Sequence, residues 1–438
     1  MLAVWTNGER VGTWSVIDGE HRFQYAESWP ASPAGRPLSL SLPLTPDNVP
    51  HRGNVVLFFF DNLLPDSDTI RRRLRDKFTT GSTDTFALLA AIGRDCVGAV
   101  QLLPLGEDPA GIDRIESEPL DEAGVERAIN SAVTGGRVIG MLEADDFRIS
   151  IAGAQEKTAL LWHAGQWRRP LGSTPTTHIF KLPLDLVGNM RADMSDSVEN
   201  EWLCARLLAA LGMPVAKCEP AVFGKRKVLV VEWFDRALQS PPTGKEWLAR
   251  LPQEDFCQTL GVSGERKYES EGGPGLRAIL RQLEISSRAN EDRLTFVKAQ
   301  LAFWLMAATD GHAKNFSIFL ERGGGFHMTP LYDVLSVWPI MGNGDNQLSP
   351  RRAKLAMALR SKNTHDHLHE IRTRHWQELA LQSGVPDAFD HMVALVLQVP
   401  DALERVEAEL PPGFPSRVFT PIRRGMLAQA EKIIAELP

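Results

Sequence analysis

Three oxygen-bearing side chains, those of Asp310, Asn315 and Asp333, carry the clearest chemical signal in the sequence. Between the last two the chain has the pattern of one β-hairpin, with an alternating strand, a glycine-rich turn centred near Gly323 and a returning strand. One-to-one antiparallel pairing about that turn sets Asn315 opposite about Leu331, so Asp333 emerges beside Asn315. The three side chains are therefore predicted to be neighbours in space.

Such a trio suits phosphoryl transfer to a hydroxyl group. A carboxylate at the end of a helix, Asp310, can accept the proton of the attacking hydroxyl, while an amide oxygen and a second carboxylate hold the Mg²⁺ that accompanies ATP. The spacing of Asp310 and Asn315 also equals that in the protein-kinase motif H-R-D-x-x-x-x-N. This spacing alone is a weak motif, and a solvated Asp-Gly turn at a helix end is the alternative. With Asp333 added, both interpretations stay open.

The elements that must position these residues follow the order of a kinase ATP lobe. They are a strand, small-residue loop and strand over residues 147–162, a strand over 177–182, a helix over about 195–211 and an apolar strand over 227–234. Kinases place a loop over the phosphates and then a lysine that a helix glutamate holds. A Walker A loop would instead lead from a strand into a helix, so that class is disfavoured. A buried helix, 292–308, apolar on nearly every face, delivers Asp310.

Candidate nucleotide contacts lie along these elements. Lys181 near a strand end could bind a phosphate, with Glu199 or Glu201 as its partner, or could be an ordinary surface lysine. Residues 152–157, here called the phosphate loop, could direct backbone amides at phosphate oxygens or form a simple hairpin turn. Residues 232–234 suit a hinge that binds adenine, or only the end of a core strand.

Length and composition bound the remaining possibilities. With 438 residues, two or three domains are expected, and we predict divisions at 1–140, 141–235 and 236–438, with residues 106–140 resembling a connector. The net charge of -7, with 24 % charged and 43 % hydrophobic residues, describes an ordinary globular protein without a general polyanion-binding signal. No internal repeat or long low-complexity tract is visible.

The same features predict a cytoplasmic protein without membrane attachment. The N-terminal residues lack the basic and apolar regions of a signal peptide. The most conspicuous apolar run, Val55 to Phe60, is too short to span a bilayer. Four cysteines show no C-x-x-C spacing, which favours a reducing compartment.

Two other clusters could suggest a metal site and a nucleic-acid patch, but we favour other interpretations of both. His365 and His369 would share one face of a helix and could bind a metal, but no third ligand stands at helical spacing, so a solvated helix start is preferred. The basic cluster Arg71 to Arg73 is interpreted as a solvated helix face rather than a nucleic-acid patch.

Taken together, several strings resemble the HipA family, the serine/threonine kinase toxins of bacterial type II toxin–antitoxin systems. The resemblance spans nearly the whole chain and is carried by Asp61–Asp66, Ile92–Val100, Arg148–Leu161, Thr174–Pro183, Leu251–Asp255, Gly272–Gly275, Ala308–Ser317 and Pro330–Asp333. It implies an α+β, two-lobed kinase-like fold with an additional N-terminal α/β subdomain and a mostly helical C-terminal lobe. It also implies phosphorylation of an aminoacyl-tRNA synthetase, most specifically the glutamyl enzyme, with arrest of translation and growth and drug-tolerant persister cells.

The resemblance assigns roles to residues. It makes Asp310 the catalytic base and Ser150 the site of a silencing autophosphorylation, and it gives Mg²⁺ to Asn315 and Asp333. The residues that it places around ATP are Ala152, Gly153, Ala154, Gln155, Glu156, Lys157, Lys181, Glu232, Trp233, Phe234, His312, Lys314, Asn315, Tyr332 and Asp333.

The implied partners are a HipB-like helix-turn-helix antitoxin and, through it, operator DNA. Two features depart from known patterns: Val334 follows the Mg²⁺ aspartate where eukaryotic kinases have Phe-Gly, and the C-terminal stretch Leu379 to Gln382 has no Lys or Arg for direct DNA contact. The alternatives are a small-molecule or lipid kinase on the same scaffold and a non-enzymatic corepressor of the antitoxin.

Overall fold

The computed structural model describes residues 1–133, 149–153, 155–188, 190–242 and 244–437, which combine helices and strands in the predicted α+β manner. The chain forms two compact units. The first contains Met1–Leu182, Ala221–Glu265 and Ile318–Phe326, and the second contains Pro183–Pro220, Arg266–Ser317 and His327–Pro438. The predicted domain limits at residues 140 and 235 stay predictions.

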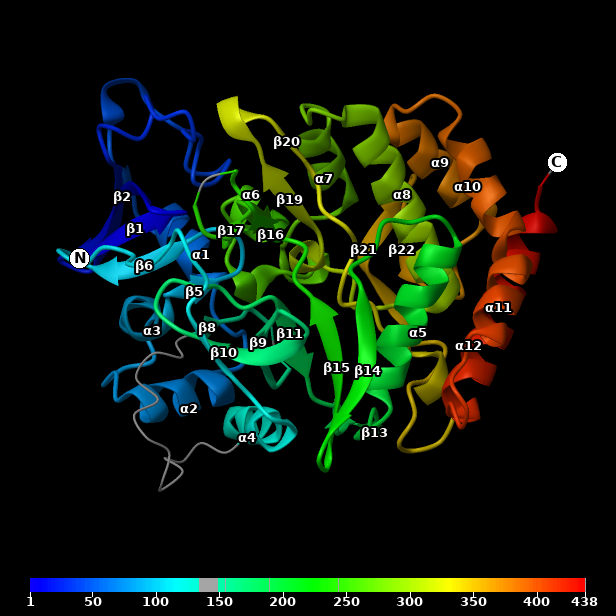
Figure 1. Ribbon diagram of the computed structural model, residues 1–438. Coiled ribbons are helices and arrows are strands. Elements are labelled where there is room, and N and C mark those ends of the chain that lie inside the picture. The colour runs from blue at the N-terminus through cyan, green and yellow to red at the C-terminus, as the bar shows by residue number, and fades with distance from the viewer. Residues whose placement is uncertain (134–148, 154, 189, 243, 438) are drawn as a thin grey trace. The chain divides into compact units, whose positions relative to one another are not determined.

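The N-terminal part of the first unit is an antiparallel sheet covered by helices (Figure 1). Its strands, in spatial order, are β4 (His51–Arg52), β3 (Glu20–Tyr25), β2 (Glu9–Ile17), β1 (Leu2–Thr6) and β6 (Gln101–Pro104). Its helices are α1 (Asn54–Asp61), α2 (Asp68–Phe78) and α3 (Thr85–Ile92). Trp14 of β2 stacks on Phe60 of α1 with ring centroids 4.0 Å apart, at the centre of an apolar cluster that joins sheet and helices. Burying such large aromatic surfaces holds the helices on the sheet.

A second, six-stranded sheet carries three of the predicted nucleotide contacts, Lys157, Lys181 and Glu232. In spatial order it comprises β14 (Cys218–Phe223), β15 (Arg226–Glu232), β11 (His178–Lys181), β9 (Lys157–His163), β10 (Gln166–Pro170) and β7 (Ser117–Pro119). Helix α4 (Glu122–Val133) covers one face, where Val125 and Ile129 pack against Leu160 and Phe180. The segment 106–140, which was predicted to be a connector, therefore contains strand β7 of this sheet and helix α4, which packs on it.

The predicted hairpin over residues 147–162 is wrong. Ser150 lies in a two-residue strand, β8 (Ile149–Ser150), which pairs in parallel with β5 (Asp95–Cys96). β9 pairs instead with β10 and β11. The alternating residues predicted a strand correctly, but the partner of β8 is distant in sequence, and local alternation does not identify such a partner.

The interpretation of Arg71 to Arg73 as a solvated face is also wrong for two of the three residues. Arg71 forms a bidentate ion pair with Asp61, with N–O distances of 2.8 and 3.1 Å. Arg73 pairs with Glu156 of the phosphate loop. Only Arg72 is exposed, its Nε donating to a backbone carbonyl of its own helix.

Three further strand pairings lead to the hairpin that lies between Asn315 and Asp333. β16 (Arg236–Gln239) pairs with β17 (Trp247–Arg250), and β18 (Gln253–Asp255) precedes the short helix α6 (Phe256–Thr259). β18 lies beside β19 (Ser317–Leu320), which pairs with β20 (Phe326–Met328). Thr329 N donates to Ser317 O at 3.0 Å and Glu321 N to Gly325 O at 2.8 Å. These bonds centre the hairpin on residue 323, as predicted.

The second unit is mainly helical. Its elements are β12 (Leu186–Val187), β13 (Ala192–Asp193), α5 (Ser197–Ala210), α7 (Leu276–Leu283), α8 (Ala289–Met306), β21 (Lys354–Arg360), β22 (Thr364–His367), α9 (Thr373–Ser383), α10 (Ala388–Leu397), α11 (Val399–Ala408) and α12 (Ser416–Ile434). Helix α8 packs against α7, α9, α10 and α12, and most of its last two turns is buried (Figure 1). This confirms the predicted buried helix. In the described part of the chain, no helix combines the length and apolar character that crossing a membrane requires.

The predicted helix start at His365 is wrong, because residues 364–367 form strand β22. His365 stacks on His375, with ring centroids 3.8 Å apart. Among the residues that the structure describes, no group of three His, Cys, Asp or Glu side chains is arranged to hold a metal ion. The His365–His369 run therefore offers no metal site of that kind.

Glu254 of β18 is a buried carboxyl group with a consequence for stability. Its side chain has no exposed surface, and Oε1 accepts from Leu40 N at 2.9 Å. Burial raises the pKa of Glu254 to about 8, although hydrogen bonds from Leu40 and Ser39 oppose the shift. Between the ordinary value of 4.5 and about 8, the folded state therefore holds a proton that the unfolded chain has released.

We expect this group to cost stability as the pH rises through that range, by at most about 1.4 kcal/mol per pH unit. Glu254→Gln removes the titration, so the melting temperature of the variant should fall less between pH 5 and pH 8 than that of the wild type. The exposed Glu404→Gln is the matched control. Equal pH dependence in the wild type and Glu254→Gln would contradict the assignment.

Candidate active site in two parts

The first part of the site follows the C-terminus of α8 in the second unit. Ala307 ends the helix in a left-handed conformation (φ 49°), and the chain then turns through Asp310 and Gly311. A Cβ on Gly311 would lie 2.5 Å from the Phe303 ring, so only glycine fits here. The Asp310 side chain remains 59 % exposed. The close packing of Gly311 thus presents the Asp310 carboxylate to solvent.

Two neighbours orient the Asp310 carboxylate. The hydroxyl group of Tyr268 donates a hydrogen bond to its Oδ1, and His312 Nε2 lies 3.9 Å from the same atom. The Tyr268 ring meets the His312 ring edge-on, with centroids 4.9 Å apart. Sequence reasoning missed Tyr268; the available signal was rarity, because the chain has only three tyrosines and two of them, Tyr268 and Tyr332, lie in this part of the site.

Asn315 links the other two residues of the predicted trio, Asp310 and Asp333. Its Nδ2 donates to the carbonyl oxygens of Asp310 at 3.1 Å and Asp333 at 3.3 Å. The prediction that these three residues are neighbours is therefore confirmed. Because Nδ2 serves both carbonyls, Oδ1 is the Asn315 atom that could bind a metal ion. Asp333 adopts φ 59°, an uncommon conformation for a residue other than glycine.

Tyr332 and Asn200 brace this arrangement. Tyr332 Oη donates to Lys314 O at 2.8 Å and lies 2.5 Å from Ser317 Oγ. These contacts connect the segment that enters the hairpin with the segment that leaves it. Asn200 of α5 donates to Ser336 O at 2.8 Å and accepts from Ser336 N at 2.9 Å. Sequence reasoning did not identify Asn200, because its partner is distant in the chain.

Four other predicted residues lie nearby in the second unit. His312 and Lys314 are buried rather than solvent-facing, at 4 % and 7 % exposure. On α5, Glu201 is buried and Glu199 is half-buried. The choice between Glu199 and Glu201 as the partner of Lys181 stays open.

The second part of the site lies in the first unit and is rich in lysine. Lys157 begins β9 and Lys181 ends β11, and the two residues are direct partners across the antiparallel pair. Lys181 is only 6 % exposed. Like charges placed opposite each other on a sheet are unfavourable, and negative groups close by, of the protein or of a bound anion, offset them. This pair of lysines is suited to phosphate oxygens.

The phosphate loop is held at both ends. Gly153 has φ 107°, its carbonyl accepts from Asp66 N at 3.1 Å, and Lys157 Nζ lies 2.6 Å from where a Cβ on Gly153 would stand. At the other end Leu182 N donates to Glu156 O at 3.1 Å. Of the remaining predicted loop residues, Ala152 and Gln155 are half-buried, and Ala154 lies outside the described residues. Glycine is favoured at position 153 because of this positive φ.

Ser150, just before the loop, is completely buried. Its Oγ donates to Leu63 O at 2.7 Å. A hydroxyl in this position is shielded, so β8 must separate from its neighbours before Ser150 can react.

The predicted adenine hinge has only part of its backbone available. Trp233 N donates to Thr177 O at 2.9 Å, and the Trp233 side chain is buried beside Ile151 and Ala159. Glu232 is exposed, and Phe234 meets the ring of Phe319 edge-on. Any hydrogen bonds to a base would have to come from the other backbone groups of residues 232–234.

A buried charge network that sequence reasoning missed supports the hinge and β8. Arg236 packs on the Trp233 ring at 4.9 Å and, with Arg250, contacts Asp95 of β5 at 3.2 and 3.1 Å. Burial alone would raise the pKa of Asp95, but Arg250 and Arg236 outweigh it and hold the pKa below its ordinary value. Removing one partner of such a buried network leaves an uncompensated charge.

The donor set around the trio fits Mg²⁺. Asn315 offers an amide oxygen and Asp333 a carboxylate, and both are the hard oxygen ligands that Mg²⁺ prefers. Mg²⁺ usually takes one or two carboxylates together with substrate phosphates and water, so a larger cluster of acidic residues is not needed.

Family models match two segments that together cover most of the chain. The model of the HipA N-terminal domain matches residues 2–103, and the model of the HipA-like C-terminal domain matches residues 149–404. A putative kinase of Sinorhizobium fredii, Y4mE, is 34 % identical over 415 residues, which covers 93 % of this chain and 91 % of the relative. The serine/threonine-protein kinase toxin HipA of Shewanella oneidensis is 30 % identical over 327 residues, or 72 % of this chain and 69 % of that protein.

The fold also matches a solved structure. The toxin–antitoxin complex of HipA, HipB and operator DNA from Shewanella oneidensis contains a chain that aligns with a TM-score of 0.78 at 24 % identity. The alignment covers 99 % of this chain and 98 % of that chain. At this identity the likeness establishes a shared fold.

Proposed function

Because this chain belongs to the HipA family, we propose that it is an ATP- and Mg²⁺-dependent serine/threonine protein kinase that acts as the toxin of a HipBA-like pair. The observation that carries this proposal is the bonding of Asn315 to both Asp310 and Asp333, because it brings together the residue proposed as proton acceptor and the two residues proposed as metal ligands. The paired lysines of the first unit supply the phosphate-binding charge.

In the proposed mechanism each residue has one task. Asp310 accepts the proton of the attacking serine hydroxyl, with Tyr268 and His312 fixing the carboxylate. Lys157, Lys181 and the amides of the phosphate loop bind phosphate oxygens, and backbone groups of residues 232–234 bind adenine. Asn315 and Asp333 would hold Mg²⁺, which neutralises charge on the transferring phosphoryl group when bound.

His312, Lys314 and Tyr332 have supporting places in this proposal. Tyr332 maintains the separation of Lys314 and Ser317, which flank Asn315, and so fixes both metal ligands. Correct positioning of the reacting groups supplies much of the acceleration in phosphoryl transfer.

Ser150 is the proposed autophosphorylation site. Its hydroxyl must first leave Leu63 O and the buried interior. A phosphate on Oγ carries charge and has no donor proton for Leu63 O, so the modified residue would not return to this position. The phosphate loop, which follows directly, would then be displaced and the kinase silenced.

The proposed substrate is a serine of an aminoacyl-tRNA synthetase, most specifically glutamyl-tRNA synthetase, in the cytoplasm. Its modification would block tRNA charging, arrest translation and growth, and promote persistence. The proposed partner is a HipB-like antitoxin that links the chain to operator DNA, as supported by the fold shared with a chain solved in complex with HipB and operator DNA.

Label transfer from γ-labelled ATP tests the proposal. With Mg²⁺, the purified chain should label glutamyl-tRNA synthetase in a cell lysate, and mass spectrometry should find phosphate on the peptide that contains Ser150. Label only in the small-molecule fraction would instead support a small-molecule or lipid kinase. ATP binding without transfer, together with unchanged repression by the antitoxin, would support a corepressor.

A further inference from the structure

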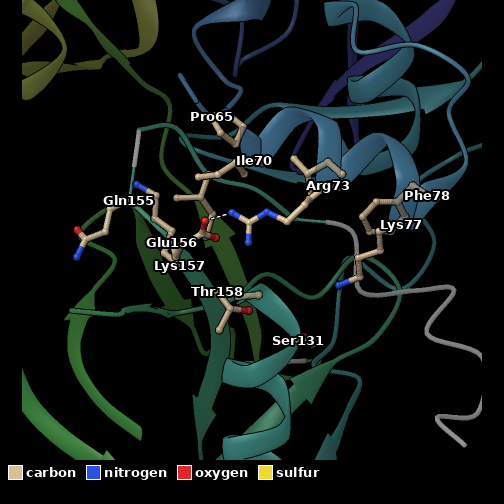
Figure 2. Close-up of a pocket in the computed structure, with 13 residues that line it drawn as sticks. Pro65, Ile70, Arg73, Lys77, Phe78, Ser131, Gln155, Glu156, Lys157 and Thr158 are labelled. Carbon is tan, nitrogen blue, oxygen red and sulfur yellow. Dashed lines mark hydrogen bonds and ion pairs between the residues drawn. The ribbon is translucent and has the colours of Figure 1, made fainter. Parts of the chain in front are cut away.

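A cavity lies behind the phosphate loop, within the first unit. Figure 2 shows α2 on one side, with Ile70, Arg73 and Lys77, the end of α4 with Ser131 below, and Glu156 of the loop facing Arg73. Its volume is about 100 Å³, whereas a single water needs about 10–15 Å³. The cavity therefore has room for a group of several heavy atoms.

The cavity extends to the face of the sheet opposite the paired lysines. Successive side chains of a strand point to opposite faces, so Thr158 and Leu160 of β9 share one face and Lys157 and Ala159 the other. Leu160 packs under α4, and Thr158 lines the cavity. Lys157, as the first residue of β9, borders the cavity as well. The Thr158 side of the cavity therefore lies on the face opposite the Lys157–Lys181 pair, while Lys157 and Ile151 line its other edge.

The lining carries more positive than negative charge. Arg73 pairs with Glu156 and donates from Nη1 to Val133 O at 2.9 Å, while its Nε is buried and has no hydrogen-bond partner among the described residues. Lys77 Nζ lies 5.6 Å from the centre of the Phe78 ring and forms no ion pair in the part of the chain that the structure describes. Among the described residues of the lining, Glu156 is therefore one carboxylate against Lys157 and the two cations of α2, and Arg73 has an unused buried donor.

The remaining surface is largely apolar. Ile70, Leu74 and Phe78 of α2, with Ala132 of α4, form the wall beside the two cations. Apolar walls with a few convergent charged groups are typical of small-molecule sites. Such a lining complements a molecule that has an anionic end and an apolar body.

We propose that this cavity binds a small organic anion, a phosphate monoester or carboxylate that carries an apolar group, and thereby regulates the phosphate loop. The anionic end would bind Lys77 and would compete with Glu156 for the Arg73 guanidinium. Release of the Glu156 side chain loosens the loop at the residue whose backbone carbonyl accepts from Leu182 N, directly after β11. The expected result is a higher KM for ATP. This regulatory effect rests on the proposed kinase function, whereas binding of the anion to the cavity does not.

Calorimetry on the full chain with phenyl phosphate tests the binding site. Lys77→Gln should weaken binding about tenfold, as expected for loss of a charge-assisted hydrogen bond. Ala132→Phe should abolish binding by filling the cavity, and Arg72→Gln, an exposed arginine of the same helix, should leave it unchanged. Inorganic phosphate, which lacks the apolar part, should bind at least tenfold more weakly. Melting temperatures check that each variant is folded.

Lys181→Met separates this cavity from the proposed ATP site: phenyl phosphate should still bind to it. Loss of binding in Lys181→Met with retention in Lys77→Gln would place the anion at the ATP site and overturn the proposal. So would absence of binding at millimolar concentration, or equal binding of inorganic phosphate. If the kinase is active and bound phenyl phosphate does not change its KM for ATP, the regulatory part is overturned. Binding to a chain that transfers no phosphate would leave the site in place and refute the kinase function instead.

Discussion

Asp310→Asn is expected to reduce phosphoryl transfer by at least about 100-fold, the lower end of what a general base contributes. The amide has nearly the same shape but is not a useful proton acceptor at neutral pH. Because the Asp310 side chain is 59 % exposed, the substitution should change the melting temperature little. The rate of label transfer to Ser150 and to the synthetase measures the effect, and toxicity on expression reports it in cells.

Asp345→Asn is the matched control, because it makes the same chemical change at an exposed carboxylate of the second unit. It should transfer phosphate at the wild-type rate. ATP binding should survive in Asp310→Asn, which distinguishes loss of proton transfer from loss of nucleotide. A variant that keeps its toxicity and its transfer rate would refute the assignment of Asp310 as the base.

Asp333→Asn is expected to reduce activity by more than the about 10- to 100-fold that loss of an outer-shell partner of a metal site costs. The amide is a weaker ligand for Mg²⁺ than the carboxylate. Asparagine tolerates the positive φ of this position, so the backbone should be retained. Activity measured against Mg²⁺ concentration should show a higher half-maximal concentration, with partial recovery at high Mg²⁺.

Asp387→Asn provides a control with the same backbone requirement, because Asp387 also has a positive φ, at 54°, and begins α10. Its Mg²⁺ dependence should equal that of the wild type. If Asp333→Asn showed that same dependence, Asp333 would not be a metal ligand.

Elements that depend on local patterns were predicted well from the sequence. The buried helix α8, the lysine strand β11, the apolar strand β15 and the helix α5 lie within a few residues of their predicted limits. In each case apolar periodicity and a local stop signal, such as Gly212 after α5, are enough to define the element.

Elements whose partners are distant in sequence were predicted poorly. β8 pairs with β5 rather than with β9, and His365 of β22 stacks on His375 of α9 instead of sharing a helix face with His369. Arg71 and Arg73 looked like solvated residues because their partners, Asp61 and Glu156, lie in other elements. No local pattern reveals such partners.

The sequence by itself determined that Asp310, Asn315 and Asp333 are neighbours, because one hairpin joins Asn315 to Asp333 and the register of antiparallel pairing places these two residues side by side. Only the tertiary structure decided how the rest of the site is supported. Tyr268 at Asp310, Leu63 at Ser150, and Arg236 with Arg250 around Asp95 are contacts between segments far apart in the chain. They arise when buried polar groups must find partners during packing, and side-chain spacing in the sequence carries no record of that pairing.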